Sequence, residues 1–403
     1  MAIRQEFRRF IDREIRPRID DFEHAGVPPY DVLRKMLVTF GIGELQKARF
    51  ESRLAKEKAA AAGSANAEPK QADGGLDPGD AAALQMIPII ELSRVAPGMV
   101  TAMGVSIGLT VGTINARGTI AQRERFVPPL LTMEKIGAWA ITEPASGSDA
   151  FGSMHATARR DGDSYVLNGN KTFITNGPYA DTIVFICKLD DGVTAPAERQ
   201  VLSFILDKGT PGLTQSKPLR KMGQHSSPTG ELFLQDVVVA KDRLLGEDEQ
   251  QSYRTGARDT FSSERSGTPA IALGIIEECM RLSIDYAKTR VQFGKPIGEF
   301  QLIQQKLAKM EVARMNVQNM LFRQVELARH AQRMSFAEAS ACKLYSAQVC
   351  MDVALEAVQL FGGNGYMAEF RVEQLCRDAK VLQIYAGTDE IQTSAIARAL
   401  LRG

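Results

Sequence analysis

The stretch WAITEPASGSD, residues 139–149, places a loop rich in hydroxyl groups directly after a short run of β type. Pro144 indicates a tight turn, and the Ser-Gly-Ser of residues 146–148 follows it. Backbone N–H groups and hydroxyls exposed in such a loop can hydrogen-bond a phosphate or a flat ring rich in heteroatoms. Taken alone, the stretch is equally typical of an ordinary junction between a strand and a turn.

Four further segments follow along the chain: KTFITNG at 171–177, RVQFGKP at 290–296, LFGGNGY at 360–366 and IYAGTDEIQ at 384–392. One such segment would be weak evidence, because short motifs recur by chance. In this order and spacing, the five segments resemble the acyl-CoA dehydrogenase family of flavoenzymes over about residues 84–401. The resemblance implies FAD as the cofactor and an acyl-CoA as the substrate.

Composition places few other constraints on function. A chain of 403 residues is too long for one core and indicates two or three domains. Its 49 basic and 48 acidic residues leave a formal net charge of +1, which offers no electrostatic reason to expect nucleic acid or an anionic membrane as partner. Five scattered cysteines indicate reduced thiols in a cytoplasmic protein. The four histidines lie far apart, so we expect no histidine-based metal site.

Two segments could be mistaken for targeting or membrane sequences. Residues 1–22 are rich in arginine, but acidic residues interleave with the bases and there is no apolar stretch, so we expect neither a transit peptide nor a secretory signal. Residues 95–116 carry no charge. They contain Pro97 and several glycines and threonines, and their strongly apolar part is short, so we expect a buried helix of a soluble domain.

The hydrophobic period changes twice along the chain, which predicts an α+β protein. Residues 1–136 have a helical pattern, with a mobile loop expected at about 56–83, where alanine, glycine and charged residues dominate. Residues 137–248 have a β pattern, in which Asp161-Gly162 and Asn168-Gly169 favour hairpin turns. Residues 249–403 are helical again. The resemblance implies an N-terminal α-helical domain, a middle β-barrel-like domain and a C-terminal four-helix bundle over these ranges.

Carried over position by position, the resemblance assigns one set of residues to the cofactor. Residues 139–148 lie along the flavin ring, with Thr142 near its reactive edge, and residues 173–175 cover its other side. Arg290 suits the FAD diphosphate because a guanidinium forks onto phosphate oxygens, and Gln301 contacts the adenosine end. The complete set is Trp139, Ile141, Thr142, Gly147, Ser148, Phe173, Ile174, Thr175, Arg290, Phe293, Gln301, Gln359, Phe361, Gly362, Gly363, Thr388 and Glu390. Ser148, Arg265 and Gly387 are assigned to the substrate.

Each of these residues also has a structural interpretation. A lone arginine is more often a solvated surface charge, and a lone glutamine is more often a residue on a helix surface. Glycines 362 and 363, which follow an apolar helix, are typical of a helix C-cap. The cap and the cofactor contact are compatible, because the same loop can approach a pyrophosphate closely where side chains would obstruct.

Ala386 is the informative departure from the family pattern. Many members carry a glutamate at this position, between tyrosine and glycine, and it abstracts the α-proton of the substrate. Some branches, including the isovaleryl-CoA and long-chain types, place the catalytic glutamate on the helix after the β domain, and Glu264 matches that position. Its structural interpretation is a first-turn glutamate favoured by the helix dipole. The resemblance also implies that the Ala386 backbone N–H helps to polarise the thioester carbonyl.

The sequence therefore predicts an FAD-dependent acyl-CoA dehydrogenase that forms a trans-2-enoyl-CoA in fatty-acid β-oxidation. The resemblance implies a homotetramer in which the Arg290 region of one subunit contacts the FAD of the next, and electron-transfer flavoprotein as acceptor. Three alternatives stay open: an oxygen-using relative (acyl-CoA oxidase or flavin monooxygenase), a catalytically silent subunit, and a purely α-helical scaffold protein. The acyl chain length cannot be deduced from these motifs.

Overall fold

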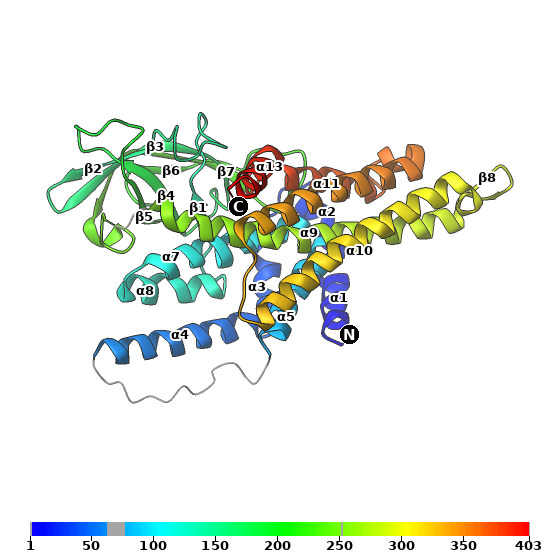
Figure 1. Ribbon diagram of the computed structural model, residues 1–403, viewed down its shortest axis with the longest axis horizontal. Helices are drawn as coiled ribbons and strands as arrows, with labels where there is room; N and C mark the ends of the chain where they lie inside the picture. The colour runs from blue at the N-terminus through cyan, green and yellow to red at the C-terminus, as the bar shows by residue number, and fades with distance from the viewer. Residues whose placement is uncertain (1, 63–76, 251–252, 403) are drawn as a thin grey trace.

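The computed structural model describes residues 2–62, 77–250 and 253–402. In Figure 1 a sheet lies at one end of the molecule, and the long helix α9 (Tyr253–Thr289) runs from its neighbourhood to the opposite end. From that end α10 (Gln301–Arg329) returns toward the N-terminal helices. The N-terminal helices pack below them. This arrangement matches the expected order of a helical domain, a β domain and a helical bundle.

The N-terminal helices form around large apolar side chains at helical spacing. Phe7, Phe10 and Ile11 of the first helix are buried, and Phe7 stacks on Phe40 with ring centroids 3.9 Å apart. The elements are α1 Ala2–Glu14, η1 Arg16–Arg18, α2 Ile19–Glu23, α3 Tyr30–Thr39, α4 Ile42–Ala61, α5 Pro78–Ser93, α6 Pro97–Met103, η2 Gly104–Thr110, α7 Val111–Arg117 and α8 Ile120–Leu131.

The range expected for the mobile loop, about 56–83, extends too far at both ends. Residues 56–61 continue α4, because alanine, lysine and glutamate are good helix formers. Residues 78–83 already belong to α5, where Asp77 caps the backbone N–H groups of Gly79 and Asp80 and Pro78 occupies the first turn. The middle of the expected loop, 63–76, lies outside the described residues.

The uncharged run forms three consecutive helical segments, of which the central one, η2, is a π-helix. From Pro97 to Arg117 it is long and apolar enough to cross a membrane by length and composition alone, and 44% of the apolar window is buried within the fold. Met99, Ala102 and Ile114 have no exposed surface, and the run packs against the first strand of the sheet. One face of the run therefore serves as core packing, as expected.

The middle of the chain forms one curled sheet of seven strands, in the order β1-β4-β2-β3-β7-β6, with β5 paired to β4. Strands β1 and β2 each pair with β4 in parallel, and the remaining pairs are antiparallel. The strands are β1 Gly137–Ala140, β2 Thr157–Asp161, β3 Ser164–Thr175, β4 Thr182–Leu189, β5 Val201–Asp207, β6 Leu213–Gln215 and β7 Thr229–Ala240.

Only one of the two expected hairpin turns is present. Asp161 and Gly162 do turn the chain from β2 into β3, where Asp161 pairs with Ser164. Asn168 and Gly169 instead lie within β3, at a register shift opposite β7. Gly169 has a φ of 147°, and a Cβ there would lie 2.6 Å from the Cβ of Ala156. The glycine therefore serves a bulge and a close approach between strands, while pairing with β7 continues on both sides.

The C-terminal part is a bundle of α9, α10, α11 and α13, with the short α12 beside it. An apolar stripe on α10 faces the core of this bundle: Met310, Val317 and Leu321 are buried, and Ile303 and Leu307 pack beside them. After η3 Lys241–Arg243, the elements are α9 Tyr253–Thr289, β8 Val291–Gln292, β9 Lys295–Pro296, η4 Ile297–Glu299, α10 Gln301–Arg329, α11 Phe336–Phe361, η5 Gly362–Tyr366, α12 Val372–Lys380, η6 Val381–Gln383 and α13 Asp389–Leu400.

Candidate active site

A buried ion pair holds the loop after β1. Lys171 and Glu143 lie 2.8 Å apart, with 0% and 4% of their side chains exposed. Lys171 also donates to the Ile141 carbonyl, and Glu143 accepts the backbone N–H groups of His155 and Ala156. Burial lowers the pKa of Lys171, whereas the neighbouring Glu143 raises it. Lys171 and Glu143, which both belong to the sequence motifs, therefore hold the loop in its conformation.

The predicted flavin-ring residues of this loop fall into a buried half and an exposed half. Trp139 and Ile141 are buried, and Thr142 is half-buried. Gly147 and Ser148 are exposed, and a Cβ on Gly147 would meet nothing within 4 Å. The start of the loop, at Trp139 and Ile141, is therefore buried in the fold, and its end, at Gly147 and Ser148, is exposed.

Phe173 projects from a bulge in β3. The register of β3 against β7 shifts between Lys171 and Ile174, and Phe173 has a φ of 56°, which is rare for an aromatic residue. The bulge leaves 69% of Phe173 exposed while Ile174 beside it is buried and Thr175 is half-buried. A large apolar ring held outward in a strained conformation indicates a surface that another group covers.

Asn176, directly after β3, ties this region to the N-terminal helices. Its side-chain amide donates to the carbonyls of Ala102 and Gly137, both at 2.9 Å, and its oxygen accepts from the Tyr30 hydroxyl at 3.0 Å. Asn176 is fully buried and its φ is 64°. The bonds to Ala102 and Tyr30 therefore fix the sheet against α6 and α3, and the bond to Gly137 ties the end of β3 to β1.

The N-terminal half of α9 meets this part of the β domain. Phe261 lies edge-on to Trp139, with ring centroids 6.0 Å apart and an interplanar angle of 89°. Glu264 and Arg265 follow one turn later on the same helix. The contact brings the predicted base close to the predicted flavin-ring residues, although the two come from different domains.

Glu264 is half-buried, and burial raises the pKa of its carboxyl from 4.5 to about 7. The positive charges of Arg265 and Lys343 oppose this shift without cancelling it. A carboxyl group with a pKa near 7 is poised to accept and release a proton close to neutral pH. The interpretation of Glu264 as a first-turn glutamate is wrong, because α9 begins at Tyr253 and the helix dipole acts mainly on the first turn.

Arg265, predicted to contact the substrate, is buried and clamps the loop that contains Ala386. Its guanidinium donates to the Ser340 hydroxyl at 2.9 Å and to the Ala386 carbonyl at 3.4 Å. It also lies over the Phe336 ring, 4.2 Å from the centroid. Arg265 thus joins α9, α11 and the 385–388 loop, and Ser340 and Phe336 are site residues that the sequence analysis did not identify.

The loop at Ala386 and Gly387 is strained and tightly held. Their φ values are 55° and 88°, both in the region that favours glycine. The Gln392 amide donates to both carbonyls, at 2.9 and 2.8 Å. A Cβ on Gly387 would lie 2.8 Å from the Gln392 amide nitrogen. Among the described residues the Ala386 N–H has no acceptor, so it remains available to another molecule.

Residues 388–390 are placed as the start of α13. The Thr388 side chain caps the helix by accepting the Ile391 N–H at 3.4 Å, and Glu390 is exposed. Asp389 pairs with the fully buried Lys343 at 3.4 Å, and Gln383 donates to its other oxygen. Lys343 is a further site residue that the sequence motifs do not indicate, because a lysine within a helix gives no signal of burial in a single sequence.

The remaining predicted cofactor residues gather at the opposite end of the bundle. Arg290, Phe293 and Gln301 are exposed around the β8–β9 hairpin, which Figure 1 shows at the far tip of α9 and α10. The 26 residues of helix and helix end from Glu264 to Arg290 span about 39 Å, at 1.5 Å per residue. These residues therefore cannot border the same bound ring as Glu264 within one chain.

The glycine loop belongs to this distal group. Gly362 and Gly363 are exposed, and Gly362 ends α11 with a φ of 62°, so the expected C-cap is confirmed. Phe361 is buried and stacks on Tyr286 with centroids 4.1 Å apart, and Gln359 is exposed. Phe361 therefore serves mainly as packing for the helix end.

No group of three or more potential metal ligands occurs among the described residues. The described part of the active-site region instead combines one carboxyl with a raised pKa, a free backbone N–H and exposed apolar surface. This set of groups suits proton abstraction next to a polarised carbonyl, beside an aromatic cofactor.

Comparison with known proteins identifies the class. Three acyl-CoA dehydrogenase domain families match in order: the N-terminal domain at 42–134, the middle domain at 138–237 and the C-terminal domain at 255–401. The chain belongs to the acyl-CoA dehydrogenase family, a family of FAD-dependent oxidoreductases.

Individual relatives cover most of the chain. The short-chain specific acyl-CoA dehydrogenase of Megasphaera elsdenii is 38% identical over 335 residues, which are 83% of this chain and 86% of the relative. The 3-(aryl)acrylate reductase of Clostridium sporogenes is 34% identical over 99% of this chain and 98% of its own. The structure of butyryl-CoA dehydrogenase from M. elsdenii matches with a TM-score of 0.84 and 33% identity, covering 100% of this chain and 99% of the other.

The residues present fit a flavin. The exposed Phe173 ring offers an apolar face, and the open space beside Gly147 lets a planar group approach the backbone. At the distal end, the exposed Arg290 guanidinium suits a diphosphate, and a Cβ added to Gly362 or Gly363 would meet nothing within 4 Å. Exposed surface that suits a flavin ring and exposed groups that suit a diphosphate thus lie at opposite ends of one chain.

Proposed function

We propose that the protein dehydrogenates an acyl-CoA thioester between Cα and Cβ to give a trans-2-enoyl-CoA, with Glu264 as the base. The carrying observation is the half-buried Glu264 carboxyl, whose pKa is raised to about 7. It lies on the helix that Arg265 links to the 385–388 loop, where Ala386 offers no carboxylate. Glu264 is accordingly the carboxyl group in this region best suited to remove a proton near neutral pH.

Each residue then has a stated task. The Ala386 N–H donates to the thioester carbonyl, which makes the α-proton more acidic, and Glu264 accepts that proton. Trp139, Ile141 and Phe173 supply apolar surface that excludes water from the reacting atoms. FAD, when bound, supplies the acceptor for the hydride from Cβ. Arg265 and Gln392 hold the loop so that the Ala386 N–H keeps its direction.

We test this function by anaerobic titration with a panel of acyl-CoAs while the flavin absorbance is followed. Butyryl-CoA, isovaleryl-CoA and 3-phenylpropionyl-CoA sample the short, branched and aromatic chains suggested by the relatives. We expect bleaching of the flavin by at least one thioester, with the enoyl-CoA recovered in equal amount. A protein that binds FAD but is bleached by none of them would be a silent subunit, contrary to the proposal.

For the electron acceptor we propose electron-transfer flavoprotein, in a cytoplasmic pathway of fatty-acid β-oxidation. The family membership supports this proposal over an oxidase. Turnover measured with a purified electron-transfer flavoprotein should greatly exceed turnover with oxygen alone. Rapid aerobic turnover with stoichiometric peroxide would instead assign the protein to the oxygen-using relatives.

We further propose a homotetramer in which Arg290 completes the FAD site of a neighbouring subunit. The support is the separation of about 39 Å along α9 between Glu264 and Arg290. Arg290→Ala should weaken FAD binding by roughly 1.5–3 kcal/mol, the contribution of a hydrogen bond to a charged group. A stable monomer saturated with FAD, observed by sedimentation, would contradict the shared site.

A mixing experiment separates action within a chain from action between chains. Subunits with Glu264→Gln and subunits with Arg290→Ala are each expected to be impaired alone. Co-expressed at equal levels, they should restore roughly a quarter of the sites, because one of the two sites in each mixed pair receives both native residues. No recovery in mixed oligomers would show that Arg290 acts within its own chain.

A further inference from the structure

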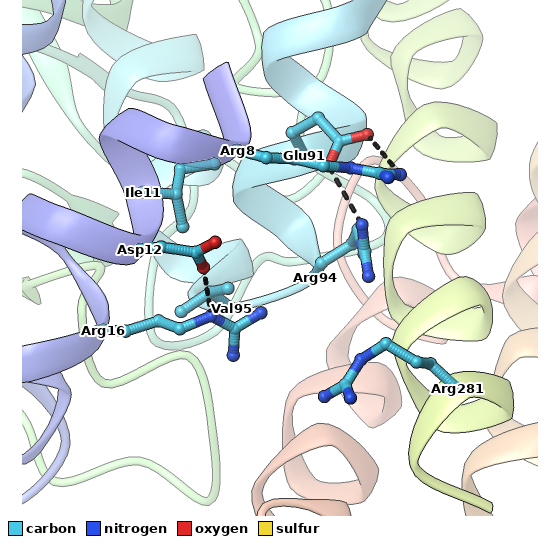
Figure 2. Close-up of a pocket in the computed structure, with 8 residues that line it drawn as sticks. All are labelled: Arg8, Ile11, Asp12, Arg16, Glu91, Arg94, Val95 and Arg281. Carbon is cyan, nitrogen blue, oxygen red and sulfur yellow. Dashed lines mark hydrogen bonds and ion pairs between the residues drawn. The ribbon is translucent and has the colours of Figure 1, made fainter. Parts of the chain in front are cut away.

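A cavity of about 460 Å³ lies between α1, η1, α5 and α9, away from the candidate active site. Figure 2 shows its walls, and four of its eight lining residues are arginines. Arg281, on α9, lies 17 residues after Glu264, or about 26 Å along the helix. The lining residues are Arg8, Ile11, Asp12, Arg16, Glu91, Arg94, Val95 and Arg281.

Two buried carboxylates hold more guanidinium groups than their charge requires. Glu91 accepts from Arg4, Arg8 and Arg94, and Glu278 accepts from Arg16, Arg94 and Arg281. The side chains of Glu91 and Glu278 are only 1% and 3% exposed. Arg94 bridges them with all of its donor nitrogens, so Arg94 alone already joins both carboxylates. Five guanidinium groups thus surround these two carboxylates, and three of them also pair with a further acidic residue: Arg4 with Glu277, Arg16 with Asp12 and Arg281 with Asp285.

Four arginines line the cavity together with two acidic residues, Asp12 and Glu91. Arg4 has Glu277 as a further partner, which leaves four guanidinium groups facing Glu91 and Glu278. The acidic partners of Arg16 and Arg281 are Asp12 and Asp285, whose side chains are 60% and 63% exposed and therefore screened by water. Burial alone would raise the pKa of Glu278, but the Arg281 hydrogen bond and the charge of Arg94 lower it to about 2.

Three arginines at the cavity keep unused donors. Among the described residues, no acceptor meets Nη1 of Arg8, Nη1 of Arg16 or Nε of Arg281. In Figure 2 the side chains of Arg16, Arg94 and Arg281 extend from three different elements toward the same space. Guanidinium groups present paired donors in a plane, the geometry that matches the oxygens of a phosphate.

We propose that this cavity binds a multiply charged oxyanion of the phosphate class, either inorganic pyrophosphate or the diphosphate of a nucleotide. The anion would accept from Arg8 and Arg16 on the N-terminal side and from Arg281 on α9. It would thus link the N-terminal helices to the bundle. The proposal is independent of the dehydrogenase activity, because none of these residues belongs to the candidate active site.

The test is calorimetric titration of the FAD-saturated protein with sodium pyrophosphate and, separately, with ADP. We expect saturable binding of one anion per chain, and a melting temperature that rises with the logarithm of the anion concentration. Sodium chloride at matched ionic strength should not reproduce the rise. Tighter binding of ADP than of pyrophosphate would assign the site to a nucleotide, and the reverse would assign it to the inorganic anion.

Variants show whether the binding occurs in this cavity. Arg281→Gln and Arg8→Gln should each weaken binding about tenfold or more, the loss expected for one hydrogen bond between charged groups. Both should fold, because Glu278 keeps Arg16 and Arg94, and Glu91 keeps Arg4 and Arg94. Arg160→Gln is the matched control, since Arg160 makes a similar forked pair with Glu249 on the β domain. Absence of saturable binding, or equal binding in all three variants, would overturn the proposal.

Discussion

The two walls of the candidate active site are held in opposite ways. On the β-domain side, Glu143 and Lys171 form a buried ion pair whose further hydrogen bonds all go to backbone groups of the same domain. On the helical side, Arg265 and Lys343 reach across from α9 and α11 to the 385–389 loop. The first network lies within one domain, whereas the second joins segments 46 and 121 positions apart.

The two walls therefore have different tasks: the β-domain wall shapes the site, and the helical wall supplies the reacting groups. The β-domain wall has its polar groups satisfied and offers exposed surface, chiefly Phe173 and the end of the 139–149 loop. The helical wall keeps groups with unused capacity, namely the Glu264 carboxyl with its raised pKa and the free N–H of Ala386. Substitutions on the first wall should therefore change stability most, and substitutions on the second should change the reaction most.

The largest effect is expected on the β-domain side, from Lys171→Met. The substitution leaves the Glu143 carboxylate buried without its cation, which should cost about 3–5 kcal/mol of the free energy of unfolding. Chemical denaturation monitored by the fluorescence of Trp139 measures it. Lys58→Met is the control, because the exposed pair of Lys58 with Glu124 should contribute at most about 1 kcal/mol. Equal losses in the two variants would remove the distinction between the walls.

On the helical side, Glu264→Gln should slow flavin reduction by at least ~10²-fold, or about 2.7 kcal/mol, with little change in substrate binding. Glutamine keeps the shape but cannot accept the proton. Stopped-flow reduction by an acyl-CoA measures the rate, and in the native protein that rate should increase as the pH rises through about 7. Glu134→Gln is the control, because Glu134 is exposed in the turn before β1 and has no assigned role. A native rate in Glu264→Gln would redirect the assignment to Asp389 or Glu390.

The loop between the two walls can be probed with Gly387→Ala. The new Cβ would meet the Gln392 amide at 2.8 Å in a backbone conformation that alanine rarely adopts, so we expect a loss of roughly 1–3 kcal/mol in unfolding free energy. Gly26→Ala separates the two causes, because Gly26 has a φ of 69° but no neighbour within 4 Å of a Cβ. If both variants lost the same amount, the contact with Gln392 would contribute nothing.

The smallest expected effect is a gain in stability, whereas the stability changes predicted above are losses. Glu264 has a pKa of 4.5 when unfolded and about 7 when folded, so its contribution to stability falls as the pH rises between these values. Above pH 7 the folded protein bears the full cost of a charged, half-buried carboxyl. Glu264→Gln should then be more stable than the native protein at pH 8 by roughly 1–2 kcal/mol, after a discount for partial exposure.

The pH dependence provides the check on this last prediction. Below pH 4.5 the carboxyl is protonated in both states, so the two proteins should melt at the same temperature at pH 4. Melting curves at several pH values measure the difference. A stabilisation that persisted unchanged at pH 4 would have another origin, such as packing of the amide.

The sequence was sufficient for the order of helical, β and helical domains, because hydrophobic period and motif spacing are properties of local segments. It also pointed to Glu264, whose role as the base stays a prediction. It was not sufficient for the Phe173 bulge or for Asn168 and Gly169, because the partner strand β7 decides where β3 is irregular. The contacts of Arg265 with Ser340 and Ala386 were equally inaccessible, since they join residues 75 and 121 positions apart. Lys343 and Phe336 became visible only once the helices were packed.

Helix α9 has a further consequence, for how such a chain can change during evolution. It carries Glu264 near its beginning and leads without interruption to Arg290 beyond its end. One inserted residue between them would turn the distal end by about 100° and shift it by about 1.5 Å. Under the proposed assembly, that end completes the neighbouring subunit's site. Lineages of this protein should therefore gain and lose residues in surface loops, while the number of positions from 264 to 290 stays constant.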